Sequence, residues 1–324
     1  MDDQATLKWF EIPRWAVEPT VRALRVGNSA FDFLFYDVNA LCLSFWGGGA
    51  IVGTAADTTS PEELLRHLDL GAISNPEGSV LVVDAKCSPY VTRFADVPTF
   101  IEWASENDSL EAVSVSGVGS SALGSAAFAW NLSLALEQPV AAIVPGYGVA
   151  DVLQQALGGW FGFGVYNWIK QPIQELLAHA APSIAAIGRE LQNSTPSCTR
   201  ASSGVPVFRR GSGSSDVLHD VLLQVPTLRR LFGHSKGALV IANAILDLPT
   251  DVMQELRINT YGCVVGKNTS AVGYQQFLGT IDALGWLNSW GNQPDHTILS
   301  WHSTNTVLPL TMHIQRLGDA PRRD

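Results

Sequence analysis

A serine stands between two glycines in Gly233-His234-Ser235-Lys236-Gly237, where a strand-like run (227–232) meets a long helical pattern (236–248). A strand that turns directly into a helix brings the two elements so close that a Cβ at either glycine would collide. The amino end of the helix then points its N–H groups and its positive dipole at the serine. We therefore predict a tight strand-to-helix turn that exposes the hydroxyl of Ser235.

Strands and helices alternate along most of the remaining chain. We predict strands at 31–36, 40–46, 79–84, 112–116, 140–144, 257–265 and 297–301, with 279–284 a short strand or loop. Helices are predicted from Ser60-Pro61 onward, at 97–105, from about 124 to 138, at 216–224 and at 269–278. This alternation indicates βαβ units and an α/β fold with a mostly parallel central sheet flanked by helices.

The alternation is interrupted between about residues 151 and 215. This stretch holds an aromatic and glycine-rich run at 158–169, a helical pattern through 187, and a loop rich in Ser, Thr, Pro, Arg and Gly at 193–215. Loops of this length in a compact domain are usually functional or disordered. We predict that 151–215 is a cap or lid inserted between two parts of one core, 1–150 and 216–324. Its aromatic residues either line an apolar acyl cleft or pack in an ordinary core.

The overall charge argues against a nucleic-acid partner. The chain of 324 residues has a formal net charge of −10, and no Lys/Arg patch of the kind that phosphate binding needs is visible. No uncharged apolar run is long enough for a membrane span, and the N-terminus lacks the basic and apolar regions of a secretory signal. We expect a cytoplasmic protein without a transmembrane segment. The oligomeric state stays open.

The four cysteines are scattered through the chain, at Cys42, Cys87, Cys198 and Cys263. They form no Cys-x-x-Cys pair, so neither a metal site nor a dense disulfide framework is predicted. Cys42 and Cys263 lie in apolar runs, where we expect them to be small buried side chains.

The residues that follow Ser235 supply what a nucleophilic serine needs. A serine hydroxyl requires a base to remove its proton, and the base requires a third group to hold its tautomer. Asp282 and then His302 follow Ser235 in the chain, and His302 comes directly after the last predicted strand. Asp295 is the rival acid, although it precedes that strand, and His313 is the rival base, although it lies in an apolar run. We expect His234 to orient the turn.

Residues 80–313 resemble an α/β-hydrolase of the lipase or esterase type. The pentapeptide around Ser235 is similar to the Gly-His-Ser-x-Gly form common in lipases, and the order serine, acid, histidine is the one that this fold uses. The resemblance implies that Ser235, His302 and Asp282 hydrolyse a small acyl ester or lipid-like substrate through an acyl-enzyme, without metal or organic cofactor. Lys236 departs from the family pattern, which usually has an uncharged residue there, and leaves the substrate class open.

Other activities are compatible with the same residues. A thioesterase or an acyltransferase uses the same triad. A protein of this fold can also bind an apolar ligand or a protein partner without catalysis, because a fold does not determine a function. The distance between Ser235 and His302 separates the catalytic from the non-catalytic alternative.

Two backbone N–H groups must stabilise the oxyanion of such a reaction. One is expected from Lys236, which follows the nucleophile, and the other from the loop after the third strand of the sheet. Counting strands back from the turn places that loop at 117–120, with Val118 or Gly119 as donor and Gly119 favoured. The glycine run 47–49 is the alternative, but it comes too early in the strand count.

The loop at 117–120 has one further interpretation. Glycines at 117 and 119 that open a helix could hold a dinucleotide pyrophosphate. The third glycine, Gly124, comes too late for the dinucleotide motif, and the acidic residue expected about twenty positions further on is missing. The sequence therefore favours the oxyanion role over the nucleotide role.

Overall fold

The computed structural model describes most of the predicted core. The described residues are 23, 30–41, 52–54, 78–87, 90–94, 96–117, 119–145, 213–246, 248–266, 271, 273–289 and 291–317. The predicted insertion lies outside them except for its last three residues, which are helical. The glycine run 47–49, Cys42 and the predicted helix at Ser60-Pro61 also lie outside the described residues.

The described strands form one nine-stranded sheet in the order β1-β3-β2-β5-β4-β6-β7-β8-β9. Their bounds are β1 Val52–Thr54, β2 Val80–Val83, β3 Val91–Arg93, β4 Ala112–Val115, β5 Val140–Ile143, β6 Arg230–His234, β7 Arg257–Tyr261, β8 Gly273–Gly279 and β9 His296–Ile298. β2 runs antiparallel to both of its neighbours, and all other neighbouring pairs are parallel. The prediction of a mostly parallel α/β sheet is confirmed.

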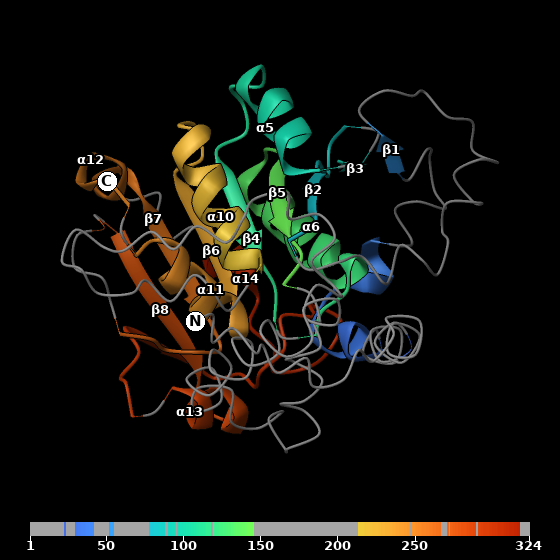
Figure 1. Ribbon diagram of the computed structural model, residues 1–324. Helices are drawn as coiled ribbons and strands as arrows, with labels where there is room; N and C mark the ends of the chain where they lie inside the picture. The colour runs from blue at the N-terminus through green and yellow to red at the C-terminus, as the bar shows by residue number, and fades with distance from the viewer. Residues whose placement is uncertain are drawn as a thin grey trace, which may run out of the picture.

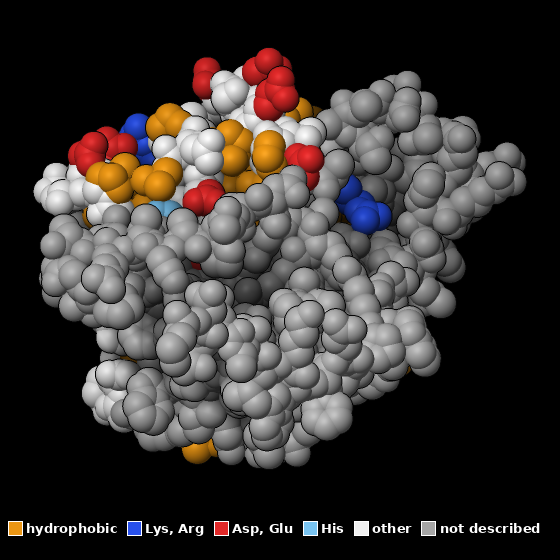
Figure 2. All heavy atoms as spheres, viewed as in Figure 1, with side chains coloured by type: hydrophobic (Ala, Val, Ile, Leu, Met, Phe, Trp, Pro, Cys, Tyr) orange, Lys and Arg blue, Asp and Glu red, His pale blue; other side chains and the backbone are white. Residues whose placement is uncertain are grey.

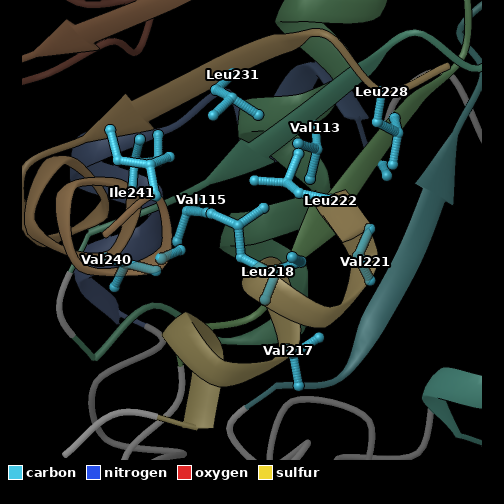
Figure 3. Close-up of a cluster of buried hydrophobic side chains, with 14 of the residues drawn as sticks. Val113, Val115, Val217, Leu218, Val221, Leu222, Leu228, Leu231, Val240 and Ile241 are labelled. Carbon is cyan, nitrogen blue, oxygen red and sulfur yellow. The ribbon is translucent and has the colours of Figure 1, made fainter. Parts of the chain in front are cut away.

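Helices cover both faces of the sheet (Figure 1). They are α5 Val97–Ser105, α6 Ala122–Leu136, α10 Gly213–Gln224, α11 Lys236–Ala244, α12 Thr250–Glu255, α13 Ala283–Asn288 and α14 Ile314–Leu317. Alternate side chains of each strand point to opposite faces, so that Val113 and Leu231 face α10 and α11 while Ala112 and Phe232 face α6. Figure 3 shows side chains of β4, β6, α10 and α11 meeting in the first of these layers.

Two predicted elements are wrong, and the described parts of two others differ from the prediction. Residues 30–35 are helical and not the predicted strand 31–36, and 38–41 are helical where the strand 40–46 was predicted to begin. The predicted helix 269–278 contains strand β8. The predicted strand or loop at 279–284 holds only the last residue of β8, followed by a turn and the first residues of α13.

The described surface has an acidic edge. Figure 2 shows acidic side chains on the upper part of this view. Exposed acids of the helices that precede β4 and β7 are Glu102 in α5, Glu106 and Asp108 just after it, and Asp251 and Glu255 of α12. The chain passes from these helices into the amino ends of β4 and β7. Within the described ranges, no helix has the length and apolarity that crossing a membrane requires.

Candidate active site

The turn between β6 and α11 is tight, as the sequence predicts, but Ser235 is buried in the structure and not exposed as predicted. Ser235 has φ 54° and ψ −119°, a region that non-glycine residues rarely occupy, and it is held there between the end of β6 and the first residue of α11. A Cβ at Gly237 would overlap the carbonyl oxygen of Val115 in β4, and one at Gly233 would lie 2.9 Å from the backbone nitrogen of Ala238. Both glycines are therefore required by close packing, as predicted.

His302 lies next to the hydroxyl of Ser235. Its Nε2 is 2.9 Å from Ser235 Oγ, and its ring is buried. On its other side, Nδ1 is 2.9 Å from both carboxylate oxygens of Asp282. Because the carboxylate accepts, the Nδ1–H donates to Asp282, and Nε2 is left to accept the proton of the Ser235 hydroxyl. The structure thus brings together the three residues that the sequence singles out.

Asp282 is fixed by the turn that joins β8 to α13. It is the N-cap of α13, and its Oδ1 accepts a 2.7 Å hydrogen bond from the backbone N–H of Gly285. A Cβ at Gly285 would overlap the Asp282 carboxylate, and a Cβ at Gly279 would lie 2.9 Å from Asp282 Cβ. The acid can approach His302 because small residues surround it.

The loop after His302 is tied to the helical residues 30–35. The hydroxyls of Ser303 and Thr304 donate to the backbone oxygens of Leu34 and Phe35, and the amide of Asn305 donates to that of Phe33. These are carbonyls of the last helical turn, which have no partner within the helix. The ring of Phe35 also packs edge-on against the His302 ring, with 5.7 Å between centroids.

A series of hydrogen bonds next to Ser235 joins the backbone of His302 to that of Gly117 through the side chains of His234 and Tyr36. His234 Nε2 is 2.9 Å from the backbone oxygen of His302, so Nε2 carries the proton and donates. Nδ1 must then accept, and it does so from the Tyr36 hydroxyl at 2.8 Å. Tyr36 Oη in turn accepts a 2.6 Å hydrogen bond from the N–H of Gly117. Burial, and then the neighbouring His302, hold the pKa of His234 well below its usual value, so the ring stays neutral.

The loop after β4 begins directly beside the serine. A Cβ at Gly117 would lie 3.3 Å from Ser235 Cβ and 2.8 Å from Tyr36 Oη. Since its N–H already donates to Tyr36, Gly117 is not an oxyanion donor in this arrangement. Gly119 is buried and has φ +70°, Val118 lies outside the described residues, and Lys236 is buried at the first position of α11. The assignment of Gly119 and Lys236 as donors stays a prediction.

Asp32 binds the other end of the same loop, at Ser120 and Ser121. Its carboxylate accepts from the hydroxyl of Ser120 at 2.9 Å, and from the hydroxyl and the N–H of Ser121 at 2.7 and 3.1 Å. Ser121 is the N-cap of α6. Burial raises the pKa of Asp32 to about 7, although the hydrogen bonds from Ser121 and Ser120 oppose the rise.

The rival residues lie elsewhere or lack such contacts. Asp295 is exposed and accepts from the backbone N–H of Gln276 at 2.8 Å, whereas Asp282 occupies the position beside His302. His313 is partly buried after Met312. His219 donates to the backbone oxygen of Ala244, and His296 stacks on Phe277, so both have structural contacts. His67 and His179 lie outside the described residues.

Cys263, predicted to be buried, is buried beside the site. Burial, reinforced by the nearby Asp282 carboxylate, raises the pKa of its thiol to about 12. It therefore stays protonated and is a poor nucleophile. No cluster of His, Cys, Asp or Glu that could hold a metal ion occurs in the part of the chain that the structure describes.

Sequence reasoning missed Asp32 and Tyr36. Both lie in a run of alternating aromatic residues that was interpreted as a strand. The one available signal was a carboxylate within a mostly apolar segment, which has to find hydrogen-bond donors if it is buried. Those donors come from a loop 88 and 89 residues further along the chain, which the sequence does not reveal.

No family model, curated protein or solved structure matches this chain. The fold and the contacts around Ser235 are therefore the observations on which a function can be argued.

Proposed function

We propose that this protein is a serine hydrolase of the α/β-hydrolase type that cleaves carboxylic esters. The observation that carries the proposal is the hydrogen-bonded series from Ser235 Oγ through His302 to Asp282, with both steps at 2.9 Å. The unusual backbone angles of Ser235 support it, because a strained residue needs a reason to persist and a nucleophile at a strand-to-helix turn supplies one.

The proposed reaction has two steps. His302 takes the proton of Ser235 as the hydroxyl oxygen attacks the ester carbonyl, and Asp282 stabilises the charged ring that results. The tetrahedral intermediate then expels the alcohol, which takes the proton back from His302 and leaves an acyl group on Ser235. A water molecule, activated by His302 in the same way, releases the acid and restores the serine.

The negative oxygen of each intermediate needs backbone donors. We assign this role to the N–H groups of Lys236 and Gly119, which belong to the two loops that meet at Ser235. The removal of one such donor typically lowers the rate by about 10²–10³-fold. Lys236 itself is a buried residue.

Labelling by a fluorophosphonate probe together with hydrolysis of p-nitrophenyl esters tests the proposal. We expect the wild-type protein to be labelled on Ser235, and the Ser235→Ala variant to lose both labelling and turnover. Ser105→Ala is the matched control, because Ser105 ends α5 at the opposite edge of the sheet and bonds only to Glu102 of its own helix. Equal labelling of wild type and Ser235→Ala would contradict the proposal.

The convergence of the three side chains favours catalysis over a purely binding role. Ester hydrolysis, thioester hydrolysis and acyl transfer can all use the same triad. The substrate panel should therefore contain oxygen esters and thioesters of several chain lengths, each assayed with and without an added alcohol acceptor. The highest kcat/KM identifies the acyl class, and transfer to the alcohol identifies an acyltransferase.

A further inference from the structure

We propose that residues 30–36, here called the brace segment, set the position of the oxyanion loop relative to Ser235 and His302, with Tyr36 and Asp32 as the positioning residues. The inference rests on the proposed function and extends it to residues that touch neither the nucleophile nor the expected substrate. It assigns a role to the segment that the sequence had placed in an ordinary strand.

Tyr36 connects both sides of the site through one oxygen atom. It accepts from the N–H of Gly117, the first residue of the oxyanion loop, and donates to His234, which in turn holds the backbone of His302. The direction of every hydrogen bond in the series is determined, because the carbonyl of His302 can only accept. A shift of the loop would therefore break a buried bond at Gly117 or at His234.

Asp32 fixes the other end of the same loop. Three donors from Ser120 and Ser121 converge on its carboxylate, and a Cβ at Gly124 would overlap that carboxylate. Gly119, the proposed donor, thus lies between two anchored points, Gly117 and Ser120. A loop held at both ends is preorganised, and a displacement of about 1 Å at such a site can cost about 100-fold in rate.

The brace segment is itself held in place by the loop that carries the base. Its last carbonyls accept from Ser303, Thr304 and Asn305. One short helix therefore contacts the loops of the proposed oxyanion donor and of the proposed base. Tyr36 and Asp32 therefore differ from residues that stabilise the fold away from the site, because the segment that carries them contacts the loops of the site itself.

Two nearly isosteric variants, Tyr36→Phe and Asp32→Asn, test the proposal. Their matched controls are Tyr274→Phe, which removes a buried hydroxyl without a hydrogen-bond partner, and Asp96→Asn, which alters the N-cap of α5. Hydrolysis of a p-nitrophenyl ester is compared with that of its thiono analogue, whose sulfur is a larger and weaker hydrogen-bond acceptor than oxygen. The ratio of the two kcat/KM values reports how well the oxyanion is held.

We expect kcat for the oxygen ester to fall by about 10- to 100-fold in both positioning variants, with KM nearly unchanged. The oxygen-to-thiono ratio should fall with it, whereas the two control variants keep the wild-type ratio. A merely structural defect would lower the amount of active protein and leave this ratio alone.

The outcomes distinguish the two proposals. Ser235-dependent labelling with a wild-type ratio in both folded positioning variants would overturn the brace and leave the hydrolase assignment standing. Failure of both variants to fold, seen by circular dichroism, would also overturn it, because the segment would then serve the fold and not the position of the loop. A wild-type protein that the fluorophosphonate does not label would contradict the proposed function itself.

Discussion

Asp32 shows how one buried carboxyl group makes stability depend on pH. Its pKa is raised from an ordinary value of 3.8 to about 7, mainly by burial. The groups that face it are the donors of Ser120, Ser121 and Gly124 on the side of α6, and Tyr36 on its own segment. A pKa that is higher in the folded protein means that the folded protein binds the proton more tightly, so the contribution to stability is complete below pH 3.8 and is lost as pH rises through about 7.

We therefore predict that wild type gains stability relative to Asp32→Asn as the pH is lowered from about 8 to about 4. The pKa difference corresponds to an upper bound of roughly 4 kcal/mol. Urea unfolding of both proteins at several pH values measures it, because the effects of all other titrating groups cancel in the difference. A difference in unfolding free energy that stays constant with pH would show that Asp32 does not titrate as its burial requires.

Gly262 gives a test of how closely His302 is packed. It follows β7, has φ +70°, and a Cβ there would lie 3.0 Å from His302 Cε1 and 3.1 Å from Nδ1. We predict that Gly262→Ala displaces the ring and lowers kcat by about 10- to 100-fold. The left-handed backbone adds a loss of stability of about 1 kcal/mol.

Gly291→Ala is the control for the backbone cost. Gly291 has φ +77° but no atom within 4 Å of the added Cβ, so the same strain should appear there without any change of activity. Equal kcat values for the two variants would show that His302 is not constrained at Gly262.

At the scale of single elements, local patterns predicted the turn at Ser235 and failed where distant contacts decide the structure. Part of the turn depends on neighbours in the sequence, since a Cβ at Gly233 would meet Ala238 and Ile241 of the adjoining helix. A Cβ at Gly237, by contrast, would meet Val115 of β4, which is distant in the sequence. Residues 30–35 are different. Their aromatic side chains favour a strand, but their last carbonyls accept from Ser303, Thr304 and Asn305, which supply a helix end from 269 to 272 residues away.

Strand β8 was mistaken for a helix for a related reason. Its two consecutive glutamines are more typical of a helix than of a buried strand. In the structure, Gln276 is buried, and its amide both donates to and accepts from the backbone of Val265, at 2.9 and 2.8 Å. A polar side chain satisfied in this way fits a core strand, but only the fold shows where its partner lies. Asp282 was still singled out as the candidate acid. Only its position after one further α/β unit was used for this, and that position does not depend on the residue at which β8 begins.

For the whole molecule, parallel strands explain why residues far apart in the sequence meet. Gly117, Ser235, Gly262, Asp282 and His302 follow the carboxyl ends of β4, β6, β7, β8 and β9 in turn. Carboxyl ends of neighbouring parallel strands lie at one edge of a sheet, which is where α/β proteins place their sites. The alternating pattern in the sequence was therefore enough to predict the convergence, but not the brace segment that crosses this edge.

Asp37 joins three distant parts of this arrangement. Its carboxylate accepts from the N–H and the hydroxyl of Thr306, at 2.6 and 2.8 Å, and from the amide of Asn131 in α6. Asp37→Ala would leave the buried amide of Asn131 and two partly buried donors of Thr306 without this acceptor, at a cost of up to about 1–3 kcal/mol each. Because Thr306 lies four residues after His302, we expect the loss to reach the site as well as the fold.

The prediction for Asp37→Ala is a loss of about 2–4 kcal/mol in the free energy of unfolding, together with slower fluorophosphonate labelling of Ser235. Urea unfolding followed by circular dichroism measures the first effect, and labelling rates in the absence of urea measure the second. Asp96→Ala is the comparison, because it removes a cap at the far edge of the sheet and should cost about 1 kcal/mol without slowing the label. A stability loss in Asp37→Ala with a wild-type labelling rate would mean that the His302 loop keeps its position without this carboxylate, and that the contacts of Ser303, Thr304 and Asn305 are sufficient to hold it.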